Sequence, residues 1–312
     1  MASRKGNPVH GWVILDKPEG LSSSRAVGIV RRVFSAAKAG HGGTLDPLAT
    51  GILPIALGEA TKTVSFAMQG AKSYSFTLSF GVQTTTDDRE GSAVATSDVR
   101  PNRDEIAAML PRFTGSIEQR PPIFSAIKID GARAYDIARK AVADGLDTLP
   151  ELAPRPVEID RFELCDVVDD SATFFVACGK GTYIRSLARD IALALGSAGH
   201  VSNLRRLSVG PFSGADAISL AFLEGLEHSS AALEHLKPVT SALDDIPALP
   251  ISGDEATKIR HGQVLPAVSV KERDRFRALL TGATAIAVEG DRPVALVVVK
   301  AGAVRPVRVL NI

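Results

Sequence analysis

The chain has 312 residues, of which 45% are hydrophobic and 23% are charged, and its formal net charge is +1. These values are typical of a soluble globular protein with a sizeable core, and the length favours one large domain and one small domain. The apolar runs are far shorter than the ~20 residues of a membrane-spanning helix, and no apolar signal-peptide segment follows the charged N-terminus, so we expect a cytoplasmic protein.

The N-terminal third predicts a strand, a helix, a loop and a second strand. Residues 11–17 favour a short buried strand that ends in a Pro–Gly turn, and residues 22–40 favour a serine-capped helix. A glycine-rich loop follows, and residues 59–69 have a helical pattern. Residues 72–81 alternate between polar and apolar side chains, which predicts a strand with one apolar face. That face is formed by Tyr74, Phe76, Leu78 and Phe80.

The middle of the chain mixes connections with short regular elements. Residues 82–104 are polar and rich in turn formers, which predicts a long connection, and residues 121–156 are typical of a projecting insertion. Strands and helices then alternate irregularly over residues 157–168, 172–181, 182–196 and 200–212. Several strand connections are short, so we predict an α+β fold with a mixed, largely antiparallel central sheet flanked by helices.

The sequence texture changes near residue 248. From there on the chain is poor in helix signals and rich in short strands that contain Val and Leu. We therefore predict a large domain of residues 1–247 and a small all-β C-terminal domain of residues 248–312. The two cysteines, Cys165 and Cys178, cannot form a disulfide framework or a zinc site alone, and we expect both to be buried.

The stretch "GHGGTLDPLATGILP", residues 40–54, contains one carboxylate, Asp46. An Asp before a Pro is a good helix N-cap, and the dipeptide alone favours that structural interpretation. The neighbouring glycines permit close backbone approach, and Pro47 fixes the turn. The loop is therefore also suited to hold a single carboxylate as a nucleophile or base.

Three more residues are candidates for a site. Arg185 lies near the start of the helix expected at 182–196, where the helix dipole disfavours a cation, so a partner anion such as Asp46 would explain it better than a surface position. Tyr74 begins the apolar stripe of its strand and either packs in the core or faces a cleft. His41 has no second His, Cys or acid at metal-ligand spacing, and we predict no metal site.

Six segments together resemble the TruB family of tRNA pseudouridine-55 synthases. They follow in order over about residues 11–212: "LDKPEGLSS", "AGHGGTLDPLATGILPIALGEATK", "KSYSFTLSFGVQTTTDDREG", "RPPIFSAIKIDGARAYDIAR", "GKGTYIRSLARDIALALG" and "HVSNLRRLSVGPF". The stretch that begins "LPISGDEATKIRHGQVL" more weakly resembles a PUA-type RNA-binding module. Residues 1–247 would then be the pseudouridine synthase catalytic domain and residues 248–312 a PUA-like domain.

The resemblance implies an isomerase that needs no cofactor and no metal and converts uridine 55 in the T loop of tRNA to pseudouridine. The N1–C1′ bond breaks, the uracil turns in the pocket, and C5 bonds to C1′. Asp46 would be the catalytic carboxylate, acting by attack on C1′ or through a glycal, with Arg185 as its partner. Tyr74 would stack on the uracil and take the C5 proton.

The same resemblance implies how tRNA would be held by a monomeric enzyme. Tyr183 and Leu204 would line the pocket for the flipped base, and His41 would fill the space that the extruded T-loop bases leave. The insertion at 121–156 would close over the T loop. Cationic residues outnumber acidic ones in residues 1–72, and together with Arg205 and Arg206 they would contact phosphates.

Two alternatives stay open on the sequence. The first is a non-catalytic protein that binds or folds tRNA with the same T-loop clamp. The second is a hydrolase that acts on a glycosidic bond, although such enzymes usually use two carboxylates and the loop has one. The presence of Asp46, Tyr74 and Arg185 together favours the isomerase.

Overall fold

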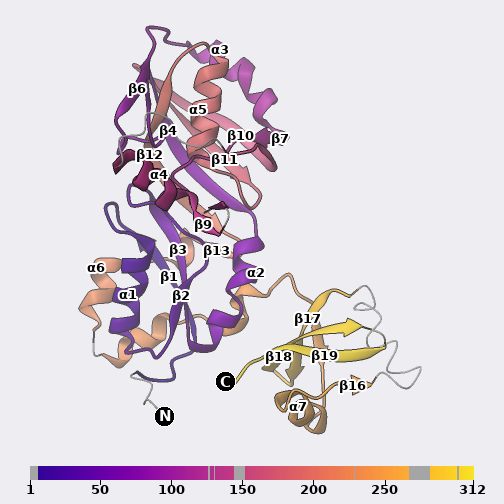
Figure 1. Ribbon diagram of the computed structural model, residues 1–312. Coiled ribbons are helices and arrows are strands. Elements are labelled where there is room, and N and C mark those ends of the chain that lie inside the picture. The colour runs from indigo at the N-terminus through magenta and orange to yellow at the C-terminus, as the bar shows by residue number, and fades with distance from the viewer. Residues whose placement is uncertain are drawn as a thin grey trace.

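The computed structural model describes residues 6–125, 127–129, 131–143, 152–227, 229–266, 282–300 and 302–312. Within these ranges the chain forms a ten-stranded sheet, a five-stranded sheet and two short ribbons. Figure 1 shows the large sheet and its helices as the main body, with the small C-terminal sheet beside one end of it.

The central sheet is mixed and largely antiparallel. Its strands are β1 (Gly11–Lys17), β2 (Ala39–His41), β3 (Thr50–Leu57), β4 (Lys72–Phe80), β7 (Gly115–Gln119), β10 (Arg155–Val168), β11 (Ser171–Cys178), β12 (Gly199–Val209), β13 (Phe212–Ser213) and β14 (Ile218–Ser219). The order is β14-β1-β3-β12-β4-β11-β10-β7, with β2 paired to β3 and β13 to β12. Only the β1–β14 and β3–β12 pairs are parallel among these described strands.

Four helices cover one face of this sheet, since all four contribute side chains to the same buried cluster. They are α1 (Ser23–Val33), α3 (Arg103–Met109), α5 (Ile184–Ala194) and α6 (Leu220–Gly225). The described chain also has α2 (Val64–Gln69), α4 (Ala134–Ala143) and α7 (Gly253–Arg260), and the 3-10 helices η1 (Gly58–Lys62), η2 (Leu110–Phe113), η3 (Gly214–Asp216), η4 (Ser230–His235) and η5 (Val239–Ala242).

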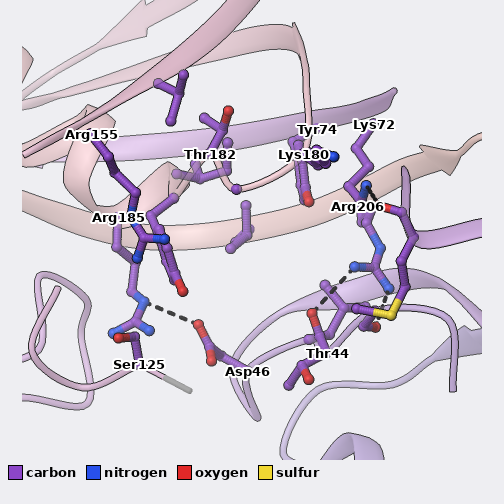
Figure 2. Close-up of a pocket in the computed structure, with 18 of the residues that line it drawn as sticks. Thr44, Asp46, Lys72, Tyr74, Ser125, Arg155, Lys180, Thr182, Arg185 and Arg206 are labelled. Carbon is purple, nitrogen blue, oxygen red and sulfur yellow. Dashed lines mark hydrogen bonds and ion pairs between the residues drawn. The ribbon is translucent and has the colours of Figure 1, made fainter. Parts of the chain in front are cut away.

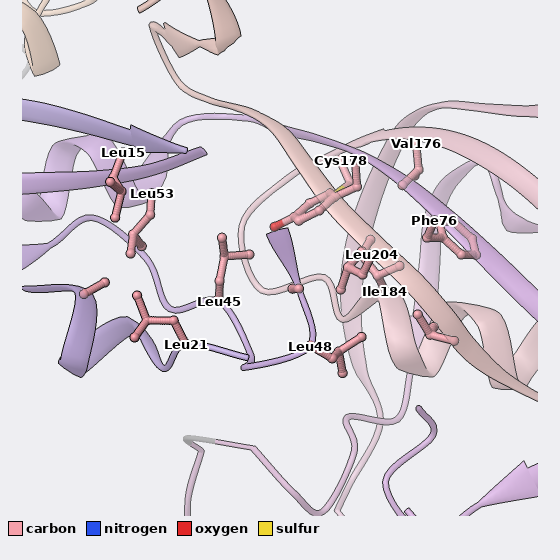
Figure 3. Packing of buried hydrophobic residues seen from close by; sticks show 14 of the residues in the cluster. Leu15, Leu21, Leu45, Leu48, Leu53, Phe76, Val176, Cys178, Ile184 and Leu204 are labelled. Atoms are coloured by element: carbon pink, nitrogen blue, oxygen red, sulfur yellow. The ribbon is translucent and has the colours of Figure 1, made fainter. Parts of the chain in front are cut away.

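Strand β1 is continuously apolar because both of its faces are buried. Successive side chains of a strand point to opposite faces. Val13 and Leu15 therefore enter the cluster beneath the four helices, whereas Trp12 and Ile14 enter a second cluster on the other face. In β4 only the face with Tyr74, Phe76, Leu78 and Phe80 is buried, as the alternation predicts. Figure 3 shows Phe76 packed near Leu204, Val176 and Ile184.

The C-terminal sheet packs on the second cluster. Its strands are β15 (Ala248–Pro250), β16 (Leu265–Pro266), β17 (Thr284–Glu289), β18 (Arg292–Lys300) and β19 (Ala303–Val309), in the order β15-β17-β18-β19-β16. Ile286 and Leu296 share that cluster with Trp12. Lys62 Nζ also donates to the Val309 carbonyl at 2.7 Å. The predicted α+β class is confirmed, with a small five-stranded sheet at the C-terminal end, and helix α7 packs on that sheet through Ala256 and Ile259.

The structure corrects three local predictions. The helix expected over 22–40 ends at Val33, because Ser35 takes a left-handed φ of 47° and the chain turns back to form β2. The connection over 82–104 contains a ribbon of β5 (Val82–Thr84) and β6 (Ala93–Thr96). Cys165 is exposed although Cys178 is buried, because Phe162 and Leu164 face the core on β10 and strand alternation places Cys165 on the opposite face.

The insertion expected at 121–156 lies partly outside the described residues. Its described part contains a second ribbon, β8 (Lys128–Ile129) with β9 (Ala132–Arg133), followed by α4. Among all the helices described, none combines the length and the apolar character that a membrane crossing requires.

Candidate active site

A cavity of about 640 Å³ lies between the 43–46 loop, β4, β12 and the turn that leads into α5. Six of the residues singled out from the sequence line it: Asp46, Tyr74, Tyr183, Arg185, Leu204 and Arg206. Segments far apart in the chain thus converge on one space, because β12 pairs with both β3 and β4. Figure 2 shows Asp46 and Arg185 facing each other, with the Tyr74 ring farther along the cavity.

Asp46 forms an ion pair with Arg185, whose Nε lies 3.0 Å from Asp46 Oδ2. The Asp46 side chain is 37% exposed and that of Arg185 only 6%, so the carboxylate is open to the cavity while its partner is buried. Asp46 lies outside any helix, and its carboxylate faces the cavity and Arg185, so the N-cap interpretation is wrong.

Arg185 is fixed by more than Asp46. Its Nη1 donates to the Thr86 carbonyl at 2.8 Å and its Nη2 to the Phe124 carbonyl at 2.9 Å. Nη1 also lies 3.5 Å from Oδ2 of Asp88, a buried carboxylate in the turn after β5. The guanidinium therefore uses its planar fork to join three segments at one point.

Asp88 was missed as a member of the site. It lies in the polar segment that the sequence suggested was only a connection, and its backbone turn is closed by Thr84 Oγ1, which donates to the Asp88 carbonyl at 2.6 Å. The neighbouring Asp87 pairs with Arg189 at 2.8 Å. The sequence signal was the presence of two adjacent acids in one segment and two arginines on the helix α5, which the structure pairs with each other.

Lys17 anchors the Asp46 loop from the end of β1. Its side chain is fully buried, and Nζ donates to the carbonyls of Pro18, Leu21 and Pro47. Burial lowers the pKa of Lys17 to about 8, although Asp46 opposes the shift. The sequence signal was a lysine at the end of a strand buried on both faces, where a cation needs specific acceptors.

Ser23 holds the same loop from the start of α1. Its hydroxyl donates to the Leu45 carbonyl at 2.8 Å and accepts from the Leu45 amide at 2.8 Å. Leu45, the residue before Asp46, is therefore held through both its backbone amide and its backbone carbonyl. The direction of the carboxylate is set by buried hydrogen bonds rather than by Pro47 alone.

Arg206 anchors the loop from β12 and corrects one prediction. It is 1% exposed and donates to the carbonyls of Ile52, Gly43 and Thr44 at 2.7, 3.0 and 3.3 Å. A buried guanidinium with these acceptors is not available to RNA phosphates. Arg205 is instead engaged with Asp16 through two hydrogen bonds, at 3.0 and 2.8 Å.

Tyr74 lies on β4 directly opposite Arg206 of β12. Its side chain lines the cavity although the residue is only 8% exposed. Burial raises the pKa of the Tyr74 phenol, and the Arg206 guanidinium opposes that shift. Leu204 lines the same side of the cavity from β12. The pair offers an aromatic and an aliphatic wall for a flat ring.

His41 stands apart from the cavity lining. It ends β2, and its Nδ1 is buried without a hydrogen-bond partner among the described residues. Burial lowers the pKa of His41, and Arg206 adds to the effect, so the neutral ring is favoured. The described residues contain no group of three or more His, Cys, Asp or Glu side chains placed to hold a metal ion.

Two family models match consecutive parts of the chain. Residues 31–184 match "TruB family pseudouridylate synthase (N terminal domain)", and residues 185–244 match "tRNA pseudouridylate synthase B C-terminal domain". The solved structure "Crystal Structure of a Cbf5-Nop10-Gar1 Complex" contains a chain that is 26% identical, with a TM-score of 0.71 over 96% of this chain and 84% of that one. The fold is thus that of a pseudouridylate synthase.

Relatives that match over nearly the whole chain identify the family within this class of enzymes. A protein named tRNA pseudouridine synthase B from Caulobacter vibrioides is 50% identical over 99% of this chain and 98% of its own length. The protein of the same name from Rhodospirillum rubrum is 47% identical over 99% of both chains. The chain belongs to the TruB family.

Proposed function

We propose that this enzyme isomerises uridine to pseudouridine at position 55 in the T loop of tRNA. The observation that carries the proposal is the placement of Asp46, the only carboxylate among the described residues that line the cavity. Relatives at about half identity over the full length are named tRNA pseudouridine synthase B, which supports tRNA as the substrate.

In the proposed reaction Asp46 acts on the ribose of the flipped nucleotide. Attack on C1′ and removal of a ribose proton to give a glycal both use a carboxylate oxygen, and Arg185 holds this carboxylate in place through an ion pair at 3.0 Å. The N1–C1′ bond breaks and C5 bonds to C1′. The proton lost from C5 is balanced by the one gained at N1, so the reaction needs no co-reactant.

Tyr74 has two roles in this proposal. Its ring stacks on the uracil beside Leu204, and its phenol oxygen receives the C5 proton while the hydroxyl proton passes to the uracil, so that the phenol stays neutral. Tyr183 closes the pocket from the turn before α5. His41, which ends β2 and is not among the residues that line the cavity, fills the space left in the T loop when its bases move outward.

We place the boundary between the catalytic domain and a PUA-like RNA-binding domain at residue 248, where β15 begins. The C-terminal sheet would extend the tRNA surface beyond the T loop. We expect a monomer that acts in the cytoplasm, where its tRNA substrate is found. No cofactor or metal is expected to take part.

The test uses an unmodified T stem-loop RNA without added metal or nucleotide. We expect pseudouridine to form, and Asp46→Asn to abolish turnover while RNA binding is largely retained. A fully active Asn variant would show that the carboxylate is wrongly assigned. A wild-type protein that binds the stem-loop but never isomerises it would support the tRNA-binding alternative.

A further inference from the structure

The cavity carries an excess of positive charge. Its described lining includes five cationic side chains, Lys72, Arg155, Lys180, Arg185 and Arg206, against a single carboxylate, Asp46. Arg185 is neutralised by Asp46 and by Asp88 outside the lining, and Arg206 is buried against backbone carbonyls. Lys72, Arg155 and Lys180 remain, and we call these three residues the cationic rim.

The charges of the cationic rim are not compensated by the protein. None of the three forms an ion pair with a carboxylate in the described part of the chain. Lys72 Nζ is held by the carbonyls of Met68 and Gly70, at 2.9 and 2.8 Å, which fixes its position without neutralising it. Lys180 is exposed, and Lys72 and Arg155 are half-buried. Like charges gathered at one opening favour an anionic ligand.

The sheet register brings the cationic rim together. Lys72 begins β4 and pairs with Cys178, the last residue of β11, and Lys180 follows two residues later. Arg155 begins β10, the strand on the other side of β11. The three residues therefore lie at one end of three adjacent strands. In Figure 2 they lie across the cavity from Asp46.

We propose that the cationic rim binds the RNA phosphodiesters that flank the flipped nucleotide. The proposal rests on the proposed function, because it takes the occupant of the cavity to be a nucleotide in an RNA strand. A nucleotide whose ribose reaches Asp46 and whose base reaches Tyr74 must leave its phosphates at the opening. Cations at the opening hold the RNA strand so that the ribose faces Asp46, whereas Tyr74 and Leu204 contact the base.

The first experiment measures the salt dependence of stem-loop binding for Lys180→Gln, Arg155→Gln and the double variant. Each lost phosphate contact should reduce the slope of log K against log salt concentration by about 0.7. We expect each single variant to bind about three- to ten-fold more weakly at low salt. The control is Arg112→Gln, an exposed arginine on η2 outside the cavity lining, which should match wild type in affinity and slope.

The second experiment places the contact on the RNA. A stem-loop with neutral methylphosphonates on both sides of the target uridine should bind wild type more weakly than the natural RNA does. The double variant should bind the two RNAs with nearly equal affinity. The cations that would contact the neutralised phosphates are already missing from it. Equal losses for wild type and double variant would overturn the proposal, as would unchanged salt slopes in all three variants.

The two proposals fail separately. If wild type forms pseudouridine but the rim variants keep wild-type slopes and methylphosphonate sensitivity, the cationic rim is wrong and the proposed function stands. If the coupling between rim and phosphates is found but wild type forms no pseudouridine, the phosphate site stands and the proposed reaction is wrong.

Discussion

Arg185 connects two carboxylates of different exposure. Its Nε lies 3.0 Å from Oδ2 of Asp46, whose side chain is 37% exposed, and its Nη1 lies 3.5 Å from Oδ2 of Asp88, whose side chain is 4% exposed. Asp88 is thus the buried partner of Arg185, and Asp46 is the carboxylate that a substrate can reach. This arrangement holds the open carboxylate of Asp46 by its Oδ2 oxygen.

The first prediction concerns the planar guanidinium of Arg185. Arg185→Lys keeps the charge but cannot reach Asp46, the Thr86 carbonyl and the Phe124 carbonyl at once. We expect the single-turnover rate to fall by roughly 100-fold or more, because a carboxylate displaced by about 1 Å loses its alignment. Arg103→Lys, in an exposed pair with Asp166, is the control and should keep the wild-type rate. A rate within two- or three-fold of wild type for Arg185→Lys would refute the positioning role.

The second prediction separates the two roles of Tyr74. Tyr74→Phe keeps the ring face and removes the phenol oxygen. Turnover should fall by about 100-fold or more if the phenol takes the C5 proton. The affinity for the stem-loop should stay close to that of wild type, because stacking does not need the hydroxyl. Tyr183→Phe tests the other tyrosine of the cavity and should lose less. Equal, small losses in both variants would leave stacking as the only role.

The third prediction concerns the glycine that faces Arg206. Gly51 has φ +97°, and a Cβ there would lie 2.1 Å from the Arg206 carbonyl oxygen. Gly51→Ala should therefore lower the free energy of unfolding by at least ~2 kcal/mol. Gly28→Ala is the matched control in α1, where a Cβ meets nothing within 4 Å, and it should raise that free energy by about 0.5–1 kcal/mol. Urea denaturation measures both; a neutral Gly51→Ala would contradict the close approach.

The fourth prediction concerns pH and Lys17, whose pKa is lowered from 10.5 to about 8 by burial. Between these two values the unfolded chain binds more protons at this site than the folded chain, so folding stability rises with pH there. Relative to Lys17→Met, the free energy of unfolding of wild type should increase by up to about 3 kcal/mol from pH 8 to 10.5.

Urea denaturation of both proteins across that pH range measures the difference between them. Subtracting the variant removes the contribution of the other groups that titrate in the same range. Parallel stability curves for wild type and Lys17→Met would show that Lys17 keeps its ordinary pKa in the folded protein.

The sequence alone indicated much of the site. The alternation in residues 72–81 was enough to place Tyr74 on the buried face of β4. The odd position of Arg185 in the first turn of its helix pointed to a partner anion, and the structure has Asp46 there. Local rules work in these cases because strand periodicity and the helix dipole act over a few residues.

Only the tertiary structure decided which charges are available. The burial of β12 does not alternate regularly, because its register with β4 shifts between Val201 and Asn203 and again between Arg206 and Ser208. Periodicity therefore could not tell that Arg206 points into the protein and Arg205 toward Asp16. Whether a cation meets RNA or a backbone carbonyl depends on strand register and on partners distant in the chain, and neither is encoded in the neighbouring residues.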